Sequence, residues 1–451
     1  METAAPRPGL ILAGLQSGNG KTAVMCMLLA ALVRRGVPVQ PFKAGPDFID
    51  PAYHARYAGR PSRNLDAWLM GPERLKQEAA THVSGRVGIV EGVMGLFDGS
   101  EATSDAGSTM EIARLLGWPV VLIVPCAKAG RSLAAALRGF AAEAGAGWIC
   151  GVILNQVSGE SHAEYLREAI APLRLPVLGV VPRDATLQWP ERHLGLQANQ
   201  ELALPGSDEL AGMAERFLDL PALMQMLAPA GRVREGDTVP GVSFRHWRLA
   251  VARDEAFHFY YESNLDYLRQ RGAELVSFSP LHDQTLPGQI DAVMLGGGFP
   301  ECFADRLSAN AALRTELREA LSAGLACYAE CGGLMFLSEN LIASDGQRFP
   351  MVGALPGQVE MTDRLQHFGY CRTSNLAGVR KVAFHGHEFH HSRWRAESER
   401  ANLWEVTRKR NAQCRWEGFS SGRLHASYVH LYFPGSEPVL ERLFPFGREG
   451  V

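Results

Sequence analysis

A glycine-rich loop near the start of the chain constrains its fold more than any other feature. The loop reads Gly14-Leu-Gln-Ser-Gly-Asn-Gly-Lys-Thr22 and stands between an apolar run, Gly9–Leu15, and a helical stretch, Lys21–Arg35. A strand, a glycine-rich turn and a helix in this order are typical of a phosphate-binding loop, because the turn brings backbone N–H groups and the helix N-terminus to the phosphates. The sequence therefore predicts a P-loop fold for this part of the chain.

Each residue at the end of the loop has an expected role. Gly18, Asn19 and Gly20 line the phosphates, Lys21 reaches the outer phosphates of ATP, and Thr22 ligates Mg²⁺. The first glycine of the loop lies one position further from the last than in the plain form of the motif. A glycine-rich turn without ligand is the alternative, which the Gly-Lys-Thr ending in this context disfavours.

Short apolar runs continue after the loop and alternate with helical stretches. The runs are β-branched and show no polar alternation, as expected for strands that are covered on both faces. They are Val37–Phe42, Val87–Val90, Val120–Val124, Cys150–Leu154 and Val177–Val181. Regular alternation of strand and helix predicts a parallel, doubly wound sheet.

The chain has 451 residues, which is too long for one ordinary core. Asp208–Leu227 is predicted as a helix, and the Pro- and Gly-rich segment after it is predicted as a linker, residues 228–245. We therefore expect an ATP-binding domain over residues 1–227 and a second α/β domain over residues 246–451. The predicted elements of the second domain are Arg248–Ala252, Glu274–Phe278, Ala292–Leu295 and Leu325–Tyr328 as strands and Tyr261–Arg271 as a helix.

Composition excludes several classes of partner. The formal net charge of −3 provides no broad basic surface, so nucleic acid is not expected. The apolar run Leu10–Leu15 is too short to span a membrane, and no signal-peptide pattern surrounds it. The eight cysteines are scattered and no pair has C-x-x-C spacing, which fits a reducing cytoplasm rather than a zinc site. The oligomeric state stays open, with a homodimer as one candidate.

Acidic residues follow two of the predicted strands. Asp47 and Asp50 come after the strand that ends at Phe42, and Glu91 and Asp98 come after the strand that ends at Val90. Ligands of open α/β sheets bind at the carboxyl ends of the strands, and Mg²⁺ prefers hard oxygen ligands. We expect Asp47 and Glu91 to join Thr22 in holding Mg²⁺, and Asp50 and Asp98 to face the substrate or an intermediate. The alternative, that these acids cap helices or turns, is strongest for Asp98, which precedes a glycine.

Asn155 closes a further predicted strand. An amide at this position can contact the edge of adenine, and a turn-forming asparagine is an equally supported alternative.

A second reactive motif, Tyr328-Ala-Glu-Cys-Gly-Gly-Leu334, lies in the second domain. Cys331 follows a predicted strand and precedes a predicted helix, Gly333–Ser338. A sharp turn between strand and helix exposes a nucleophile, and the helix N-terminus favours the thiolate. A buried, inert cysteine is the alternative, and we expect it for the other seven.

Two further groups could complete a thiol site. His430, in the strand-like run Tyr428–Pro434, could act as the base, or it is a satisfied core histidine. Backbone N–H groups of Gly297 and Gly298, after another predicted strand, and of Gly332 could form an oxyanion hole. The histidine-rich segment Phe384–His391 is predicted as a structural or substrate-facing strand, with a metal site as the less favoured alternative.

Taken together, the motifs resemble those of the cobyrinate a,c-diamide synthase family, which amidates a corrin at the expense of ATP and glutamine. The resemblance covers nearly the whole chain. It rests on Ser17–Thr22, Lys43–Pro51, Asn64–Asp66, Glu91–Gly99, Ala256–Tyr261, Asn264–Leu265, Gly297–Glu301, Ala329–Gly333 and Gly386–His390. Of these, Lys43–Pro51 and Glu91–Gly99 are specific individually.

The resemblance implies one purpose for the two halves. The first half is similar to dethiobiotin synthetase and would phosphorylate a carboxylate of cobyrinate or hydrogenobyrinate. The second half resembles class I glutamine amidotransferases, in which Cys331 would release ammonia from L-glutamine to displace the phosphate. Two rounds would convert the a and c acetate side chains in cobalamin biosynthesis.

The sequence departs from the wider amidotransferase pattern at two places. Ala329 replaces the glycine that usually precedes such a nucleophile, and Tyr432 stands where a glutamate often follows the histidine by two residues. The sequence therefore predicts a Cys331–His430 dyad without a nameable third member, and the role of Glu330 stays open.

Three alternatives remain at this point. Nickel-sirohydrochlorin a,c-diamide synthase shares the same motifs and differs in the macrocycle, and cobyric acid synthase acts on four other side chains. A partitioning or assembly ATPase without amidation is disfavoured, because Gln16 occupies the place of the extra lysine that such proteins carry early in the loop.

Overall fold

The computed structural model describes residues 8–187, 189, 204–227, 244–374, 376, 383–396 and 401–446. The described residues form two compact units, one up to Leu227 and one from Phe244 onward. The predicted linker, 228–245, lies outside the described residues apart from its last two positions.

The first unit is built on a seven-stranded sheet in which all neighbouring strands are parallel. The strands, in spatial order, are β3 (Arg63–Leu65), β2 (Val39–Ala44), β4 (Val87–Gly95), β1 (Gly9–Gly14), β5 (Val120–Pro125), β6 (Ile149–Val157) and β7 (Val177–Pro182). The prediction of a doubly wound parallel sheet is confirmed. Its central strands are buried, as their unbroken apolar runs require.

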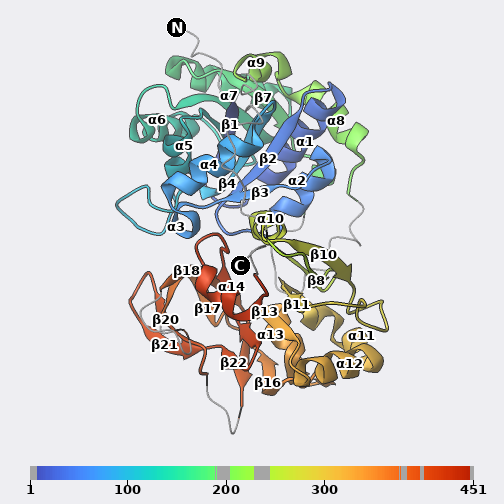
Figure 1. Ribbon diagram of the computed structural model, residues 1–451. Helices are drawn as coiled ribbons and strands as arrows, with labels where there is room; N and C mark the ends of the chain where they lie inside the picture. Colours follow the sequence, from blue (N-terminus) through green and yellow to red (C-terminus); the bar gives the residue numbers. More distant parts are fainter. Residues whose placement is uncertain are drawn as a thin grey trace. The chain divides into compact units, whose positions relative to one another are not determined.

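Helices cover both faces of this sheet (Figure 1). One face packs on α1 (Lys21–Arg34), α2 (Asp50–Ala58), α8 (Ser207–Phe217) and α9 (Leu220–Gln225), which share one apolar core with it. The remaining helices are α3 (Ala67–Met70), α4 (Pro72–His82), α5 (Thr109–Leu116), α6 (Ser132–Ala144) and α7 (Glu160–Ile170). Helix α1 is buried along almost its whole length, because its sequence is apolar on all sides and not on one stripe only.

The segment predicted as one helix, Asp208–Leu227, forms two helices, so that prediction is wrong. Helix α8 ends before Leu218, whose backbone is extended, and the Asp219 side chain caps the start of α9 by accepting from Ala222 N. Leu218 bridges to Gly179 of β7, so pairing with the sheet interrupts the helix.

The second unit contains a six-stranded sheet. Its order is β10 (Ala273–Phe278), β8 (Trp247–Ala252), β11 (Ala292–Leu295), β13 (Ala326–Glu330), β23 (Leu424–Ser427) and β22 (Phe419–Ser421), and only the pairing of β22 with β23 is antiparallel. The helices of this unit are α10 (Glu262–Gln270), α11 (Ala304–Ala309), α12 (Ala311–Ser322), α13 (Gly332–Leu337) and α14 (Glu437–Leu443). This confirms the predicted α/β class of the second half.

Smaller sheets accompany it. An antiparallel sheet contains β21 (Cys414–Glu417), β20 (Trp404–Arg408), β17 (His367–Ser374), β18 (Phe384–His390) and β24 (His430–Leu431). A mixed sheet contains β15 (Arg348–Pro350), β14 (Ser338–Ile342), β16 (Leu355–Met361) and β19 (Ser392–Arg395), with β14 and β16 parallel. A two-stranded antiparallel sheet pairs β12 (Gly297–Gly298) with β9 (Phe257–Phe259). The predicted strand in the histidine-rich segment is confirmed as β18, whereas the run around His430 is a strand over two residues only. No helix in the described parts of the chain has the length and apolar content of a membrane span.

Candidate active sites

The predicted phosphate loop connects β1 to α1. Gly20 has a φ of +75°, and a Cβ atom there would lie 2.4 Å from the Asn155 side-chain nitrogen, so both the backbone and the available space require glycine. The Asn155 amide donates to the backbone oxygen of Asn19 at 2.8 Å. Asn155 thus lies against the phosphate loop and braces it through its amide nitrogen, while its contact with adenine stays a prediction.

Two side chains of the loop are in a state that suits an incoming anion. The Lys21 ammonium donates to the backbone oxygens of Gln16 at 3.2 Å and Met94 at 2.7 Å. Both amide atoms of Asn19 are buried and have no hydrogen-bond partner within the described part of the chain. Such buried orphan groups are costly, and a phosphate oxygen of ATP could accept a hydrogen bond from the amide nitrogen of Asn19. The residues present therefore fit a nucleotide.

The predicted acidic residues converge on Lys43, at the end of β2. The Lys43 ammonium lies 2.6 Å from Asp50 Oδ2, 3.0 Å from Glu91 Oε1 and 3.8 Å from Asp47 Oδ2. All four side chains are buried. One cation among three carboxylates leaves a net negative site, which attracts a further cation. The prediction omitted Lys43 as a functional residue, although it opens the specific segment Lys43–Pro51.

Glu91 is held from both sides. Its Oε1 accepts from the Thr22 hydroxyl at 2.8 Å and its Oε2 lies 2.5 Å from His54 Nε2. Burial raises the pKa of Glu91, but the Lys43 ammonium and the His54 hydrogen bond outweigh it and bring the pKa below its usual value. Glu91 is therefore an anion beside Thr22, as a metal ligand must be. His54, which is fully buried and also bonds Ser62 through Nδ1, was not predicted.

Thr22, Asp47 and Glu91 offer the hard oxygens that Mg²⁺ prefers. The other oxygen of Asp47 caps the following turn, accepting from the backbone N–H of Ile49 at 2.9 Å and of Asp50 at 3.3 Å. Within the described residues, no group of three or more His, Cys, Asp or Glu side chains could hold a metal ion by itself. Mg²⁺ in nucleotide sites usually takes only one or two carboxylates and is completed by phosphates and water, so the donor set fits.

Asp98 forms a turn. Its Oδ2 accepts from Gly95 N at 2.9 Å, which is the turn-forming alternative that its sequence context left open. The same segment supplies the Met94 oxygen that Lys21 contacts, so Asp98 fixes the backbone beside the phosphate loop.

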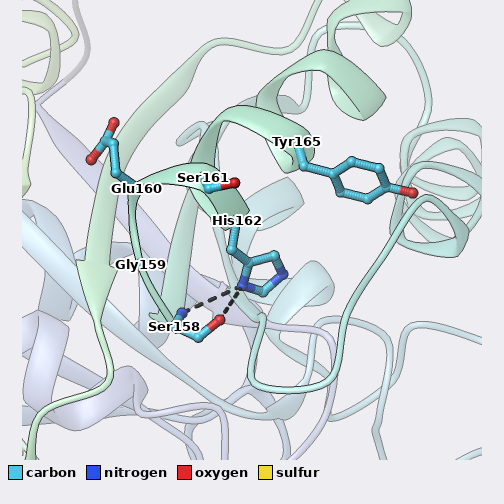
Figure 2. Close-up of a pocket in the computed structure, with 6 residues that line it drawn as sticks. All are labelled: Ser158, Gly159, Glu160, Ser161, His162 and Tyr165. Atoms are coloured by element: carbon cyan, nitrogen blue, oxygen red, sulfur yellow. Dashed lines mark hydrogen bonds between the residues drawn. The ribbon is translucent and has the colours of Figure 1, made fainter.

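An open hollow lies beyond the carboxyl end of β6, at the start of α7. It is lined by Ser158, Gly159, Glu160, Ser161, His162 and Tyr165 (Figure 2). His162 points toward Ser158, with 2.8 Å between its Nδ1 and the Ser158 hydroxyl, and its Nε2 lies 2.9 Å from the Ala129 oxygen. His162 therefore joins the turn after β6 to the loop after β5, at the sheet edge that carries Asn155.

In the second unit, Cys331 occupies the predicted turn between β13 and α13. Its backbone has φ 48° and ψ −101°, a conformation that costs a non-glycine residue on the order of 1–3 kcal/mol. Its N–H donates to the Ser427 oxygen at 2.7 Å, which holds the turn against β23. Strain of this kind matches the geometry of a nucleophile turn between strand and helix, although the Cys331 side chain itself is buried.

His430 bonds to both Cys331 and Glu330. Its Nδ1 lies 3.1 Å from Glu330 Oε2, while Glu330 Oε1 accepts from Leu431 N at 3.0 Å and from the Tyr328 hydroxyl. Burial disfavours the charged form of His430, but the hydrogen bonds with Cys331 and Glu330 outweigh it and raise the pKa of His430 to about 10. A cationic imidazole beside the sulfur stabilises the thiolate, which is the nucleophilic form.

Glu330 therefore has the geometry of a third member, which the sequence analysis could not name. Neighbouring residues of a strand point to opposite sides, so a glutamate directly before the nucleophile is not expected to share its site. The positive φ of Cys331 turns the chain at this point and lets both side chains meet His430.

The glycines predicted for the oxyanion hole surround the nucleophile turn. A Cβ atom on Gly297 would lie 2.8 Å from His430 Cε1, and one on Gly332 would lie 3.1 Å from Gly298 N. The backbones of β12 and α13 therefore approach each other beside Cys331, where N–H groups could stabilise an oxyanion.

One histidine of the β18 segment also belongs to this site. The His387 ring stacks on His430, with 4.9 Å between centroids and 20° between planes, and its Nδ1 lies 3.2 Å from the Tyr261 hydroxyl. Burial and the charge of His430 keep the pKa of His387 well below its usual value. The neutral ring of His387 thus stacks against the charged ring of His430 and fixes its position.

Comparison with known proteins identifies the domain that carries each candidate site. Residues 10–196 match the CobQ/CobB/MinD/ParA nucleotide binding domain, and residues 248–438 match the CobB/CobQ-like glutamine amidotransferase domain. The cobyrinate a,c-diamide synthase of Syntrophotalea carbinolica is 42% identical over 97% of this chain and 98% of its own length. The chain belongs to the cobyrinate a,c-diamide synthase family.

Relatives of this chain are named for one of two macrocycles, cobyrinate or hydrogenobyrinate. The cobyrinate a,c-diamide synthase of Streptococcus sanguinis is 40% identical over 97% of this chain and 99% of its own length. A hydrogenobyrinate a,c-diamide synthase from Sinorhizobium is 41% identical over 94% of this chain and 98% of its own length. Relatives named for cobyrinate and a relative named for hydrogenobyrinate are therefore similar to this chain at nearly the same identity.

Proposed function

We propose that this chain amidates the a and c acetate carboxylates of cobyrinate or hydrogenobyrinate, with ATP and L-glutamine as co-substrates. One observation carries the proposal. A single chain of this family combines a phosphate loop that has carboxylates beside it with a Cys331–His430–Glu330 arrangement. A carboxylate is a poor electrophile and ammonium is no nucleophile, so amidation needs both an activating and a nitrogen-releasing site.

The activating step belongs to residues 1–227. An acetate oxygen of the macrocycle attacks the γ-phosphorus of ATP, so that the bond to the β–γ bridging oxygen breaks and ADP leaves an acyl phosphate behind. Lys21 and the backbone of Gly18, Asn19 and Gly20 stabilise the charge on the phosphates. Thr22, Asp47 and Glu91 would hold Mg²⁺, which neutralises phosphate charge when bound. Asp50 and Asp98 would face the substrate or the acyl phosphate.

The nitrogen-releasing step belongs to residues 246–451. The Cys331 thiolate attacks the side-chain amide carbon of L-glutamine, and N–H groups near Gly297, Gly298 and Gly332 stabilise the oxyanion. His430 gives its proton to the leaving nitrogen, so that ammonia departs and a thioester remains. His430 then takes a proton from water, which hydrolyses the thioester to glutamate. Ammonia displaces phosphate from the acyl phosphate and completes the amide.

The test is a direct product analysis. Purified chain is incubated with ATP, L-glutamine and either cobyrinate or hydrogenobyrinate, and mass spectrometry follows the macrocycle. Two successive mass changes, each of one carboxylate to one carboxamide, are expected with one or both corrins. Amidation of nickel sirohydrochlorin with neither corrin accepted would reassign the substrate within the same chemistry.

A further inference from the structure

Glu301 is a half-buried acid with one fully buried carboxylate oxygen, and the reaction above has no use for it. It lies in a short 3-10 helix, η3 (Pro300–Phe303), directly after the β12 glycines. Its Oε2 has less than 1 Å² of exposed surface and no hydrogen-bond partner within the described part of the chain. A buried carboxylate oxygen without a partner costs free energy, so a ligand that supplies a donor at this point would be bound favourably.

Burial raises the pKa of Glu301 to about 7, and a hydrogen bond from its own backbone only partly offsets this. By contrast, the carboxylates of two buried acids in the same unit have hydrogen-bond partners. Glu330 bonds His430, and Glu417 accepts from Trp404 and Ser427. Glu301 therefore differs from the structural acids around it.

The position of Glu301 connects it to the nucleophile. A Cβ atom on Gly332, the residue after Cys331, would lie 3.0 Å from Pro300 Cδ, and η3 packs against α13. Tyr428 lies near both residues, because burial and then the charges of Cys331, Glu417 and Glu301 raise the pKa of Tyr428. Glu301 and Cys331 thus lie on two sides of the same small region of the second unit.

The substrate carries the group that this carboxylate lacks. When the side-chain amide carbon of L-glutamine is at Cys331, its α-ammonium group lies about 5 Å further along the molecule, at the end of four bonds. An ammonium group is a cation with three donors, which suits a buried carboxylate, and charge-assisted hydrogen bonds are among the stronger ones.

We propose that Glu301 binds the α-ammonium group of L-glutamine and thereby selects this amino acid over other primary amides. The inference rests on the proposed glutaminase step at Cys331, and it gives Glu301 a role in specificity and not in bond breaking.

The test compares wild type with the variant Glu301→Gln on two substrates. These are L-glutamine and glutaramate, which is L-glutamine without the α-amino group. Glutamate or glutarate release is measured for wild type and variant with each substrate. Wild type is expected to favour glutamine over glutaramate by about 10- to 100-fold in kcat/KM. In Glu301→Gln the KM for glutamine should rise by a similar factor and the preference should disappear. Asp305→Asn, an exposed acid on α11, is the matched control and should change neither value.

Each outcome bears on a different claim. A variant that keeps both the wild-type KM and the full preference overturns the role of Glu301, which would then be a neutral structural acid. Wild type that releases no glutamate at all would instead overturn the glutaminase step. Ammonium-dependent amidation by Glu301→Gln shows that the variant is folded. If it is not, Glu301→Asp, which keeps the charge, should raise the KM and retain part of the preference.

Discussion

The two candidate sites differ in how much of their chemistry is already assembled. At the thiol site, His430 is hydrogen-bonded to both Cys331 and Glu330, and the strained backbone of Cys331 is held by Ser427. At the phosphate loop, Lys21 contacts protein carbonyls, and Lys43 is paired with three carboxylates. The first site is organised for attack, whereas the second must exchange protein contacts for phosphates when ATP binds.

This difference has a physical reason. A thiol nucleophile needs no cofactor, so its partners can all be side chains fixed by folding. Phosphoryl transfer depends on charges that the nucleotide and its metal bring. Before ATP binds, the lysine side chains of this site therefore contact carbonyl and carboxylate oxygens of the protein. Substitutions at the two sites should therefore affect different half-reactions.

The largest effect is expected for Cys331→Ala. Without the sulfur no thioester forms, and glutamine-dependent amidation should fall by at least about 10⁴-fold. Amidation with an ammonium salt should remain, because the phosphate loop is intact. Glutamate release and macrocycle mass are the measurements, and Cys414→Ala, an exposed cysteine, is the control. Loss of ammonium-dependent amidation as well would show that the sites are not separable.

Lys21→Met is the complementary change. It removes the cation that neutralises the outer phosphates, and amidation should fall about 1,000-fold with either nitrogen source. Glutamate release from glutamine in the absence of macrocycle should stay within a few-fold of wild type. ADP and glutamate are measured in parallel, and a fall in basal glutamate release equal to the fall in ADP would contradict the division.

Glu330→Gln tests the third member of the thiol site. The amide keeps a hydrogen bond to His430 but loses the charge, so glutaminase turnover should fall about 100-fold. The pKa of His430, raised to about 10 from an ordinary 6.5, makes a stability contribution that is complete below pH 6.5 and is lost as pH rises through 10. The fall in Tm between pH 7 and 10 should therefore be shallower in the variant, and an unchanged Tm profile would remove Glu330 from the arrangement.

His54→Ala should have the smallest effect. It leaves Glu91 ionised beside Lys43 but unbraced at Oε2, so the Mg²⁺ concentration for half-maximal amidation should rise about 10-fold. His54→Gln can keep the hydrogen bond and should restore part of the loss. A changed maximal rate with an unchanged Mg²⁺ dependence would place the role of His54 elsewhere.

The sequence predicted what local patterns encode. Unbroken apolar runs predicted the parallel sheet of the first unit, and Gly-Lys-Thr after such a run predicted the loop. The positions of Asp47, Asp50 and Glu91 at one edge of the sheet followed from the rule that parallel strands end together. The predicted helix Asp208–Leu227 failed, because pairing of Leu218 with β7 is a tertiary contact that periodicity does not reveal.

What the sequence could not predict depends on contacts between distant segments. Glu330 meets His430 across a hundred positions, and the positive φ that permits this is set by the turn at Cys331. His54 reaches Glu91 from the first turns of α2, and His387 reaches His430 through the pairing of β18 with β24. Each of these needs a register or a packing distance that spacing along the chain does not contain.

The central claim is that ATP activates an acid while glutamine supplies the nitrogen, and a product balance tests it most directly. Purified chain is given its macrocycle, ATP and glutamine, and ADP, glutamate and new carboxamide are quantified together over the time course. The account predicts ADP at least equal to carboxamide, and glutamate at least equal to carboxamide. Carboxamide formed from glutamine while ATP is left unconsumed would contradict it.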